Sequence, residues 1–206
     1  MDKIKIDIMY LFGASGHGKV IAEIAETCGI VIDGFIDCDD NKKSVLGYPV
    51  FKELPSTTES LVVAIGDNGI RKKIVDNNID AKYPIIIHKM STVSKRTLLG
   101  AGTVIMAGAT INVDVNIGQQ CIINTNASVD HDCLIEDYVH LSPNVALAGN
   151  VTIGEGTHVG IGVCIIQGIR IGKWCTIGAG AVIIRDIPDG CTVVGNPGKI
   201  IRKMND

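Results

Sequence analysis

The residues best suited to do chemistry form a short run around His131. The imidazole of His131 is flanked by two carboxylates in the segment Val129-Asp130-His131-Asp132-Cys133. A carboxylate next to an imidazole makes the ring a better base near neutral pH. We therefore predict His131 as a general base and Asp132 as its partner, although this run alone does not decide between Asp130 and Asp132. The alternative is a solvent-exposed histidine at a corner of the fold.

A glycine-rich segment near the N-terminus is the second candidate. Gly13-Ala14-Ser15-Gly16-His17-Gly18 follows an apolar run over residues 4–12 and precedes apolar residues at helical spacing. Backbone N–H groups at a helix N-terminus can hold a phosphate, so Ser15, Gly16 and His17 are predicted to line a phosphate site. The spacing differs from the G-x-G-x-x-G of dinucleotide-binding proteins. An ordinary tight turn between a strand and a helix is the alternative.

Two further loops are expected to reach the same ligand. Residues 31–36 and 61–65 have the pattern of strands, and residues 70–75 that of a helix. Residues 1–82 are therefore predicted to form a small, Rossmann-like, parallel α/β unit. Asp37 ends the first of these strands, where its carboxylate could meet a ribose or uracil donor; a solvated loop acid is the alternative. Gly66 would let the second loop approach the ligand.

The second half of the chain has a strict six-residue period. Starting at Ile87, every sixth residue is aliphatic: Ile87, Val93, Leu99, Ile105, Ile111, Ile117, Ile123, Val129, Ile135, Leu141, Leu147, Ile153, Val159, Ile165, Ile171, Ile177 and Ile183. A second track lies two residues earlier and is mostly small or β-branched: Thr103, Ala109, Val115, Cys121, Ala127, Cys133, Val139, Val145, Val151, Thr157, Val163, Cys175 and Ala181.

This period predicts a β-helix over residues 83–206, which also include a C-terminal tail. A helix cannot keep a period of six, whereas two- or three-residue strands separated by tight corners can. One hexad per side and three sides give a prism with eighteen residues per coil, and coils stack about 4.8 Å apart. Glycine often follows the aliphatic residue, as at Gly100, Gly118 and Gly154, and is expected to form the corners.

Two other histidines are placed by the same period. His140 and His158 each precede an inward aliphatic residue and are eighteen residues apart. They should point outward on one flat face, in neighbouring coils. His131 lies nine residues before His140, which is half a coil, so within one chain the two face opposite sides of the prism. A site that uses both must combine residues of different subunits.

The sequence resembles a known family of enzymes, first in its repeat pattern and then, more narrowly, in its motifs. The hexad pattern over residues 87–187 is similar to the left-handed β-helix of hexapeptide-repeat acyltransferases; the left hand comes from this resemblance, because parallel crossovers are otherwise nearly always right-handed. The exit sequence 194–201 is similar as well, with Gly198 where that family usually has Ala. The segments 13–19, 64–68 and 71–73, together with Asp37 and 129–133, resemble bacterial UDP-4-amino-sugar N-acetyltransferases and sialic-acid O-acetyltransferases. Those enzymes often have Glu where Asp132 stands.

The resemblance implies an enzyme with a defined reaction. It would transfer acetyl from acetyl-CoA to the amino group of a nucleotide-linked amino sugar, with direct attack on the thioester and His131 as general base. His140 would help to hold the acetyl-CoA arm, and Ile161 and Ala179 stand where the family contacts CoA through its backbone. A homotrimer with active sites between the prisms is implied, and no metal.

Three alternatives remain at this point. Acetylation of a hydroxyl on sialic acid or another sugar is the nearest. A carbonic-anhydrase-like zinc site needs three converging histidines, and the spacing of His131, His140 and His158 does not provide them. A non-catalytic protein would bind a nucleotide sugar and release no CoA.

The amino-acid composition excludes several classes of protein. The 206 residues are 46% hydrophobic and 20% charged with a net charge of −3, which argues against disorder and against a nucleic-acid-binding surface. The longest apolar runs, such as 85–87, are too short to cross a bilayer, and Asp7 interrupts any signal-peptide core. Seven cysteines are an odd number, and Cys121, Cys133 and Cys175 fall on the inward track. We therefore expect a cytoplasmic protein whose cysteines pack as small hydrophobic residues.

Overall fold

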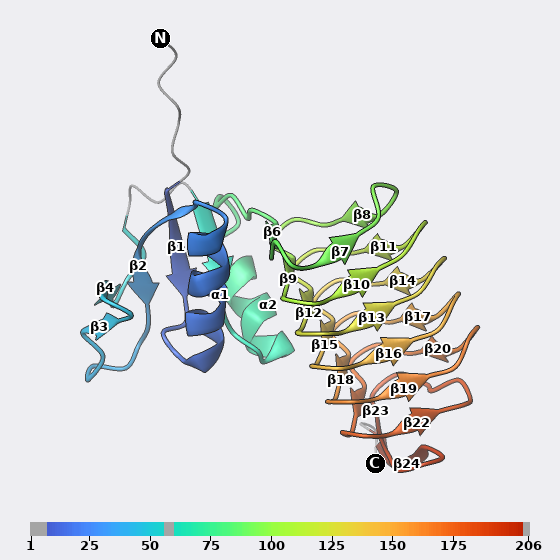
Figure 1. Cartoon of the computed structure of the whole chain (residues 1–206). Coiled ribbons are helices and arrows are strands. Elements are labelled where there is room, and N and C mark those ends of the chain that lie inside the picture. Colours follow the sequence, from blue (N-terminus) through green and yellow to red (C-terminus); the bar gives the residue numbers. More distant parts are fainter. Residues whose placement is uncertain (1–7, 56–59, 204–206) are drawn as a thin grey trace.

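The computed structural model describes residues 8–55 and 60–203. An α/β unit lies beside a three-sided β-helix whose coils stack along one axis (Figure 1). The part of the expected first strand before Ile8 lies outside the described residues. Both predicted architectures are thus present, one after the other along the chain.

The α/β unit contains a five-stranded sheet with the order β3-β4-β2-β1-β5. Strand β1 pairs in parallel with β2 and β5, and β2 pairs in parallel with β4. The elements are β1 (Ile8–Phe12), α1 (Gly16–Thr27), β2 (Val31–Ile36), β3 (Ser44–Val45), β4 (Tyr48–Phe51), β5 (Ser60–Val63) and α2 (Asn68–Asp76). The strands and helices expected over 31–36, 61–65 and 70–75 are therefore confirmed to within a few residues.

A hairpin between β2 and β5 was not expected from the sequence. Strands β3 and β4 are antiparallel, and they are joined by Leu46 and Gly47, whose φ angles are +52° and +84°. Two central residues with positive φ are typical of the type I′ turn, which matches the twist of a two-residue hairpin. Leucine is an unusual residue for this conformation, and for that reason the turn has a weak sequence signal.

The β-helix follows the six-residue period strand by strand. Each two-residue strand ends on the aliphatic residue that the period predicts: β6 (Ile86–Ile87), β7 (Thr92–Val93), β8 (Leu98–Leu99), β9 (Val104–Ile105), β10 (Thr110–Ile111), β11 (Asn116–Ile117), β12 (Ile122–Ile123), β13 (Ser128–Val129), β14 (Leu134–Ile135), β15 (His140–Leu141), β16 (Ala146–Leu147), β17 (Thr152–Ile153), β18 (His158–Val159), β19 (Cys164–Ile165), β20 (Arg170–Ile171), β21 (Thr176–Ile177) and β22 (Val182–Ile183). The tail adds β23 (Cys191–Val194) and β24 (Lys199–Lys203), which pair antiparallel.

The strands form three parallel faces, which we name after one strand each. The β13 face contains β7, β10, β13, β16, β19 and β22; the β14 face contains β8, β11, β14, β17 and β20; and the β15 face contains β6, β9, β12, β15, β18, β21, β23 and the antiparallel β24. Partners are eighteen residues apart, as in the pair Ser128 and Ala146. The predicted length of one coil is thus confirmed.

Both inward tracks form the core of the prism. All the residues of the second track are buried, as are the aliphatic positions from Ile105 onward. Ile87 in the first coil remains 38% exposed, because no earlier coil covers it. The buried cysteines belong to this core, and all seven cysteines are free thiols.

The expectation about the corner glycines was wrong. The left-handed backbone conformation recurs three residues after the aliphatic position, at Asn126 and Asp132 for example, with φ of +57° and +61°. The glycines that directly follow the aliphatic residue have another role: a Cβ on Gly100 would lie 2.3 Å from the backbone nitrogen of Gln119. These glycines allow the backbones of successive coils to approach, while the left-handed residue that turns the corner is most often Gly, Asn or Asp and in three coils Gln120, Tyr138 or Trp174.

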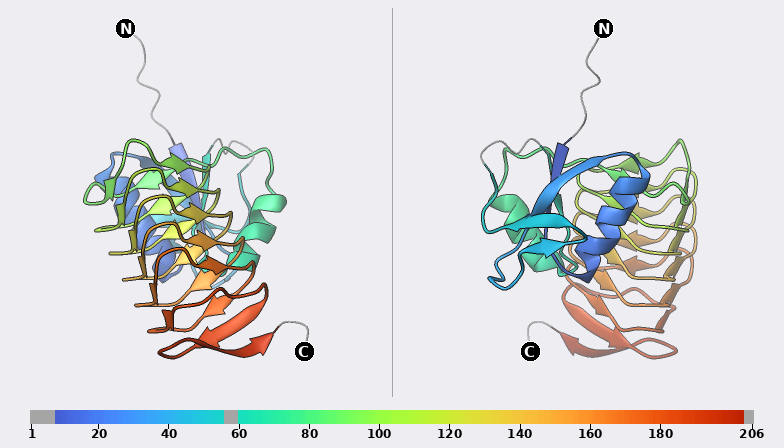
Figure 2. Two further views of the ribbon diagram at one scale, coloured as in Figure 1. Left: turned by 90° about the vertical axis from the view of Figure 1, so that its right-hand side faces the viewer. Right: turned by 60° about the vertical axis from the view of Figure 1, so that its left-hand side comes forward.

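The α/β unit covers the β15 face of the prism (Figure 2). Outward residues of the first coils, including Ile86, Val104 and Ile122, are buried in one apolar cluster with residues of α1 such as Ile21 and Ile24. Burial of such apolar area stabilises the contact by about 25 cal/mol per Å².

A buried arginine fastens α2 to the same face. Arg71 is 1% exposed, and its guanidinium donates from Nε to the Gln120 carbonyl oxygen (2.8 Å) and from Nη2 to the Tyr138 carbonyl oxygen (2.8 Å). Nη2 also donates to Asn68 Oδ1 (2.8 Å), and Asn68 Nδ2 donates to the Gly156 carbonyl oxygen (3.0 Å). Successive coils of the prism are thereby joined to one helix of the α/β unit.

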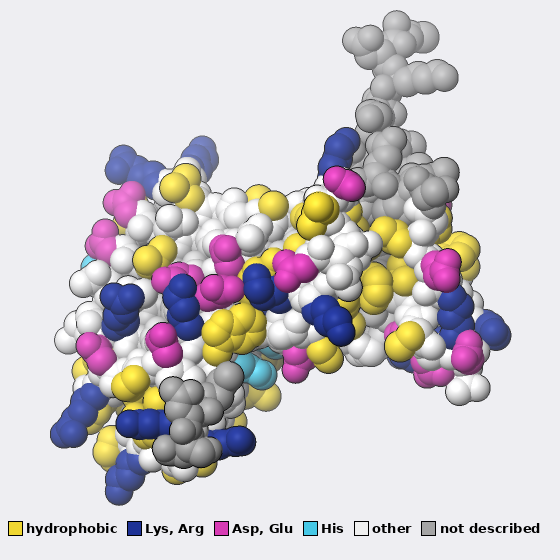
Figure 3. Space-filling view, turned by 180° about the vertical axis from the view of Figure 1, so that it is seen from behind, with side chains coloured by type: hydrophobic (Ala, Val, Ile, Leu, Met, Phe, Trp, Pro, Cys, Tyr) yellow, Lys and Arg dark blue, Asp and Glu magenta, His cyan; other side chains and the backbone are white. Residues whose placement is uncertain are grey.

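The surface carries charges of both signs. On the face turned to the viewer in Figure 3, lysine and arginine side chains alternate with acidic ones instead of gathering in a single basic patch. Within the described ranges, neither helix has the length and apolar character that a membrane-spanning helix requires.

Replacing Arg71 should weaken the docking of the two parts. In Arg71→Met the carbonyl oxygens of Gln120 and Tyr138 lose their charged donor, and hydrogen bonds to charged groups contribute about 1.5–3 kcal/mol each. We expect the free energy of unfolding in urea to fall by about 3 kcal/mol, while Arg96→Met, at an exposed position, changes it by less than about 0.5 kcal/mol. Equal stability of the two variants would contradict the role of Arg71.

Candidate active site

His131 lies at the corner between the β13 and β14 faces, which we call the His131 edge. Its Nδ1 is 2.7 Å from Asp132 Oδ2. The other neighbour is turned away, because Asp130 Oδ1 accepts hydrogen bonds from the His131 backbone N–H (2.8 Å) and from Asn112 Nδ2 (2.8 Å). Of the two carboxylates that the sequence offered, Asp132 contacts the ring and Asp130 braces the corner.

These contacts set the protonation of the ring. The hydrogen bond that the ring donates to Asp132, followed by the charge of Asp130, raises the pKa of His131 above its ordinary value. Because a carboxylate can only accept, Nδ1 carries the hydrogen and the neutral ring has its lone pair on Nε2. No hydrogen bond to Nε2 occurs among the described residues, and the side chain is 54% exposed. The ring therefore presents a basic nitrogen outward.

The neighbouring thiol has a structural environment. Cys133 is 1% exposed; its Sγ donates to the Ala148 carbonyl oxygen (3.3 Å) and accepts from the Val151 N–H (3.4 Å). Burial raises the pKa of Cys133, which disfavours the thiolate that a nucleophile requires. The inward position predicted for this cysteine is confirmed.

Gly13 and Gly18 in the N-terminal loop are required by the backbone or by packing, whereas Gly16 is not. Gly13 has a φ of +115°, and a Cβ on Gly18 would lie 2.1 Å from the Gly13 carbonyl oxygen, whereas a Cβ on Gly16 would meet nothing within 4 Å. Ser15 is the N-cap of α1 and its side chain makes no capping hydrogen bond. Ser15 and Gly16 are both exposed, so the first N–H groups of α1 face open space. A helix N-terminus of this kind suits an anion.

Asp37 holds this loop in place. Its Oδ2 accepts from the Ala14 N–H (2.9 Å) and from Lys42 Nζ (2.8 Å), and its Oδ1 accepts from the Asp39 N–H (3.0 Å). Burial acts to raise the pKa of Asp37, but the hydrogen bonds from Lys42, Asp39 and Ala14 bring it below its ordinary value. Lys42 was not identified from the sequence, and it places an ammonium group beside the glycine loop.

His140 connects the α/β unit with the prism. Its Nδ1 donates to the Gly66 carbonyl oxygen (3.2 Å), and its Nε2 accepts from Asn124 Nδ2 (3.2 Å). This tautomer agrees with the orientation of Asn124, whose Oδ1 accepts from the Thr125 N–H. His140 is 8% exposed. The His140 side chain points outward from the prism, as predicted, but the loop that contains Gly66 covers it.

Three imidazoles gather at this contact. The rings of His140 and His158 stack at 4.8 Å with 10° between their planes, and the ring of His17 lies 6.4 Å from that of His140. Burial, followed by the charge of Arg71, lowers the pKa of His17 to about 4. Burial, followed by the charge of His158, lowers the pKa of His140 to about 3. These rings are neutral at physiological pH.

Ile161 and Ala179 occupy the corner between the β15 and β13 faces, the Ile161 edge. Both are exposed, and they lie one coil apart. The adjoining corner residues Gly162 and Gly180 have open space where a Cβ would be. This edge therefore offers bare backbone to an extended ligand.

The structure thus divides the predicted residues into three groups. Ser15, Gly16, His17, Asp37, Gly66 and His140 come together where the α/β unit meets the β15 face. His131 and Asp132 lie on the opposite edge of the prism, and the Ile161 edge and the His131 edge border the two sides of the β13 face.

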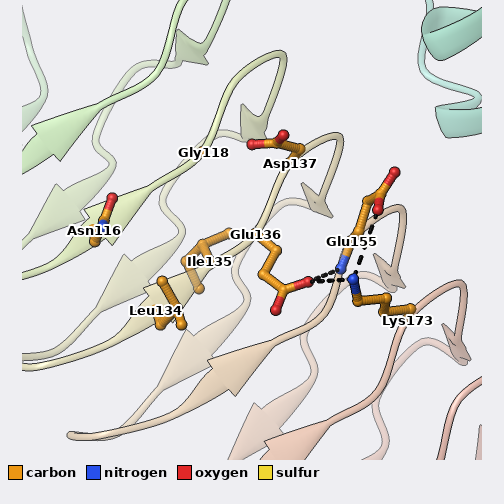
Figure 4. A pocket seen from close by; sticks show the side chains of 8 residues that line it. All are labelled: Asn116, Gly118, Leu134, Ile135, Glu136, Asp137, Glu155 and Lys173. Carbon is orange, nitrogen blue, oxygen red and sulfur yellow. Dashed lines mark hydrogen bonds and ion pairs between the residues drawn. The ribbon is translucent and has the colours of Figure 1, made fainter.

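A separate groove of about 340 Å³ runs along the β14 face toward α2 (Figure 4). It is lined by Asn116, Gly118, Leu134, Ile135, Glu136, Asp137, Glu155 and Lys173. Its charges pair with one another: Lys173 Nζ is 3.5 Å from Glu136 Oε2 and 3.8 Å from Glu155 Oε2. The groove contains none of the predicted site residues.

Sequence reasoning missed several residues of the site. Arg71 Nη1 donates to the carbonyl oxygens of Ile65 (2.9 Å) and Gly66 (3.3 Å), and Asn124 orients His140. Their partners are distant in sequence, so no local pattern reveals them. The coil length offers one usable signal, because it places Gly149 directly beside His131.

The prism is that of the hexapeptide-repeat acyltransferases, with the left-handed parallel β-helix of that class. Residues 9–78 match the PglD N-terminal domain, and residues 150–185 match the bacterial transferase hexapeptide (six repeats). The chain belongs to the sugar N-acetyltransferases of this class. The predicted family is thereby confirmed.

Two solved structures and one curated relative carry this assignment. The acetyltransferase domain of PglB from Neisseria gonorrhoeae FA1090 is 41% identical with a TM-score of 0.89, over 94% of this chain and 99% of that chain. A variant of perosamine N-acetyltransferase from Caulobacter crescentus, in complex with CoA and GDP-perosamine, is 37% identical with a TM-score of 0.92, over 98% and 100%. UDP-N-acetylbacillosamine N-acetyltransferase from Bacillus subtilis is 41% identical over 108 residues, which are 47% of this chain and 50% of that relative's length.

Asp132 should control the basicity of His131. In Asp132→Asn the acceptor of the ring Nδ1–H loses its negative charge, so the pKa of His131 should fall toward its ordinary value. The matched control is Asp114→Asn, since Asp114 has the same left-handed conformation (φ +59°) at the same corner one coil earlier. NMR titration of the imidazole would measure both; an unchanged His131 pKa in Asp132→Asn would contradict the contact.

Proposed function

We propose that the protein transfers the acetyl group of acetyl-CoA to the amino group of a nucleotide-linked amino sugar, of the UDP-4-amino-sugar type. The observation that carries this proposal is the His131–Asp132 pair, with Nδ1 held at 2.7 Å and Nε2 open. The relatives support it, because one is solved with acetyl-CoA and another with CoA and GDP-perosamine. The free thiols of all seven cysteines suit a reducing, cytoplasmic location.

In the proposed reaction the sugar amine attacks the thioester carbon directly. His131 Nε2 accepts the amine proton as the C–N bond forms, and the carbonyl oxygen becomes an oxyanion that backbone N–H groups stabilise. Collapse of this intermediate breaks the C–S bond, and the CoA thiolate takes up the proton that His131 had accepted, which restores the base. The elevated pKa of His131 favours the first transfer.

The two ligands would approach from different elements. The nucleotide diphosphate is placed at the N-terminus of α1, with Ser15, Gly16 and His17 around it and Lys42 supplying positive charge. Asp37 and Gly66 border the same site. The acetyl-CoA arm is placed along the Ile161 edge, beside Ala179 and His140, where bare glycine backbone leaves room.

A homotrimer would bring the His131 edge of one subunit together with the ligand-binding residues of another. His131 and the Ile161 edge flank opposite sides of the β13 face, so a threefold arrangement of β13 faces brings His131 of one subunit next to the Ile161 edge of another. The outward residues of the β13 face suit close packing because all are small and uncharged: Thr92, Thr110, Ser128, Ala146, Cys164 and Val182. The β14 face has Leu98, Leu134 and Arg170 at equivalent positions.

CoA release with a panel of acceptors would test the activity. UDP- and GDP-linked amino sugars, CMP-sialic acid and free sialic acid would each be supplied with acetyl-CoA. Wild-type protein should release CoA with an amino sugar, and His131→Ala should lower kcat by about 10²–10⁴-fold with little change in the KM for acetyl-CoA. His88→Ala, at a histidine outside the site, is the control.

Each unexpected result of this assay would contradict a different part of the proposed function. CoA release with only sialic acids would indicate O-acetylation, and binding of a nucleotide sugar without any CoA release would indicate a non-catalytic protein. A folded His131→Ala variant with kcat within about threefold of the wild type would remove the proposed base, since such catalysis contributes at least about 10².

Cysteine labelling would test the proposed trimer. Cys38 in the α/β unit and Cys164 on the β13 face are both exposed in a single chain. If three β13 faces meet, iodoacetamide should modify Cys38 in the native protein and spare Cys164, and sedimentation should give three times the mass of the chain. Equal labelling of the two thiols in a monomeric protein would contradict the shared site.

A further inference from the structure

Gly149 is the residue on which the His131 ring rests. It lies eighteen residues after His131, at the same edge one coil further along, and the Asn150 N–H donates to the His131 carbonyl oxygen (2.8 Å). A Cβ built on Gly149 would be 2.6 Å from Cε1, 2.7 Å from Nε2 and 3.1 Å from Nδ1 of His131. The imidazole therefore occupies the space that a side chain at this position would need.

The backbone does not require glycine here. Gly149 is not among the residues with positive φ, and the nearest atoms to its would-be Cβ all belong to His131. The equivalent positions in other coils carry side chains: Lys95, Val113, Gln167 and Arg185. The corner accepts a side chain wherever no imidazole lies above it.

We propose that Gly149 is a positioning residue for His131: its missing side chain lets the imidazole lie against the next coil while Nδ1 stays on Asp132. This inference rests on the proposed function, in which Nε2 of this ring takes the proton. Asp132 alone cannot fix the ring firmly, because its own side chain is 60% exposed. The bare Gly149 backbone supplies the second point of contact.

The proposal predicts a selective effect of a methyl group. In Gly149→Ala the backbone conformation is allowed, so the coil should fold, and the ring should swing out toward solvent and leave Asp132. Displacement of a catalytic group by about 1 Å can cost about 10²-fold in rate. We expect kcat to fall by about 10–100-fold with both KM values within about threefold, because neither ligand loses its binding residues.

Two further readouts separate this role from a structural one. The pKa of His131, followed by NMR, should fall toward its ordinary value, and the acidic limb of the pH–rate profile should move to lower pH with it. Gln167→Ala, at the same edge one coil further along, is the matched control and should leave kcat and the His131 pKa unchanged. Thermal stability and oligomeric mass should be those of the wild type in both variants.

A double variant gives the decisive comparison. If Gly149 acts only through the imidazole, adding Gly149→Ala to His131→Ala should cause no further loss of kcat. The proposal would be overturned if Gly149→Ala lowered kcat by the same factor in the wild-type and in the His131→Ala protein. A Gly149→Ala protein with wild-type kcat and wild-type His131 pKa would also overturn it. A harmless His131→Ala would instead refute the proposed base, while the NMR shift in Gly149→Ala would still test the contact between Gly149 and the ring.

Discussion

The hydrogen bonding of each coil to the next is the constraint on which the rest of the structure depends. Parallel pairing at an interval of eighteen residues requires an aliphatic residue inward at every sixth position, and one inserted residue would turn buried side chains toward solvent. The same interval stacks chemically important residues in columns. It places His158 on His140 with ring centroids 4.8 Å apart, and it places Gly149 under His131.

This constraint also separates the candidate site residues within one chain. Residues half a coil apart face opposite sides of a three-sided prism, so His131 cannot approach His140 in the same subunit. Arg71 holds the α/β unit on the β15 face through neutral carbonyl oxygens of two coils, which keeps the loops of that unit at this face. In the proposed reaction the base would therefore come from another subunit, and the small residues of the β13 face would permit the approach.

The sequence predicts the prism almost completely because its period is a direct consequence of inward packing. It predicts the α/β unit less well: Leu46 occupies a left-handed turn that leucine seldom adopts, so the β3–β4 hairpin was missed. The role of the glycines after the aliphatic positions was misjudged because close approach and corner turning both favour glycine. The choice of Asp132 over Asp130, and the contacts of Arg71 and Asn124, depend on side-chain directions that a linear pattern does not contain.

The two faces of the prism place histidines in opposite electrostatic environments. At the contact with the α/β unit, burial and nearby charges such as that of Arg71 lower the pKa values of His17, His140 and His158, to about 4 for His17 and about 3 for His140. On the His131 edge, exposure and two carboxylates raise the pKa of His131. Of these four rings, only His131 has a pKa above its ordinary value. The rings at the contact therefore favour the neutral form and can serve as fixed hydrogen-bonding and stacking surfaces, whereas the proposed base is the ring that takes up a proton most readily.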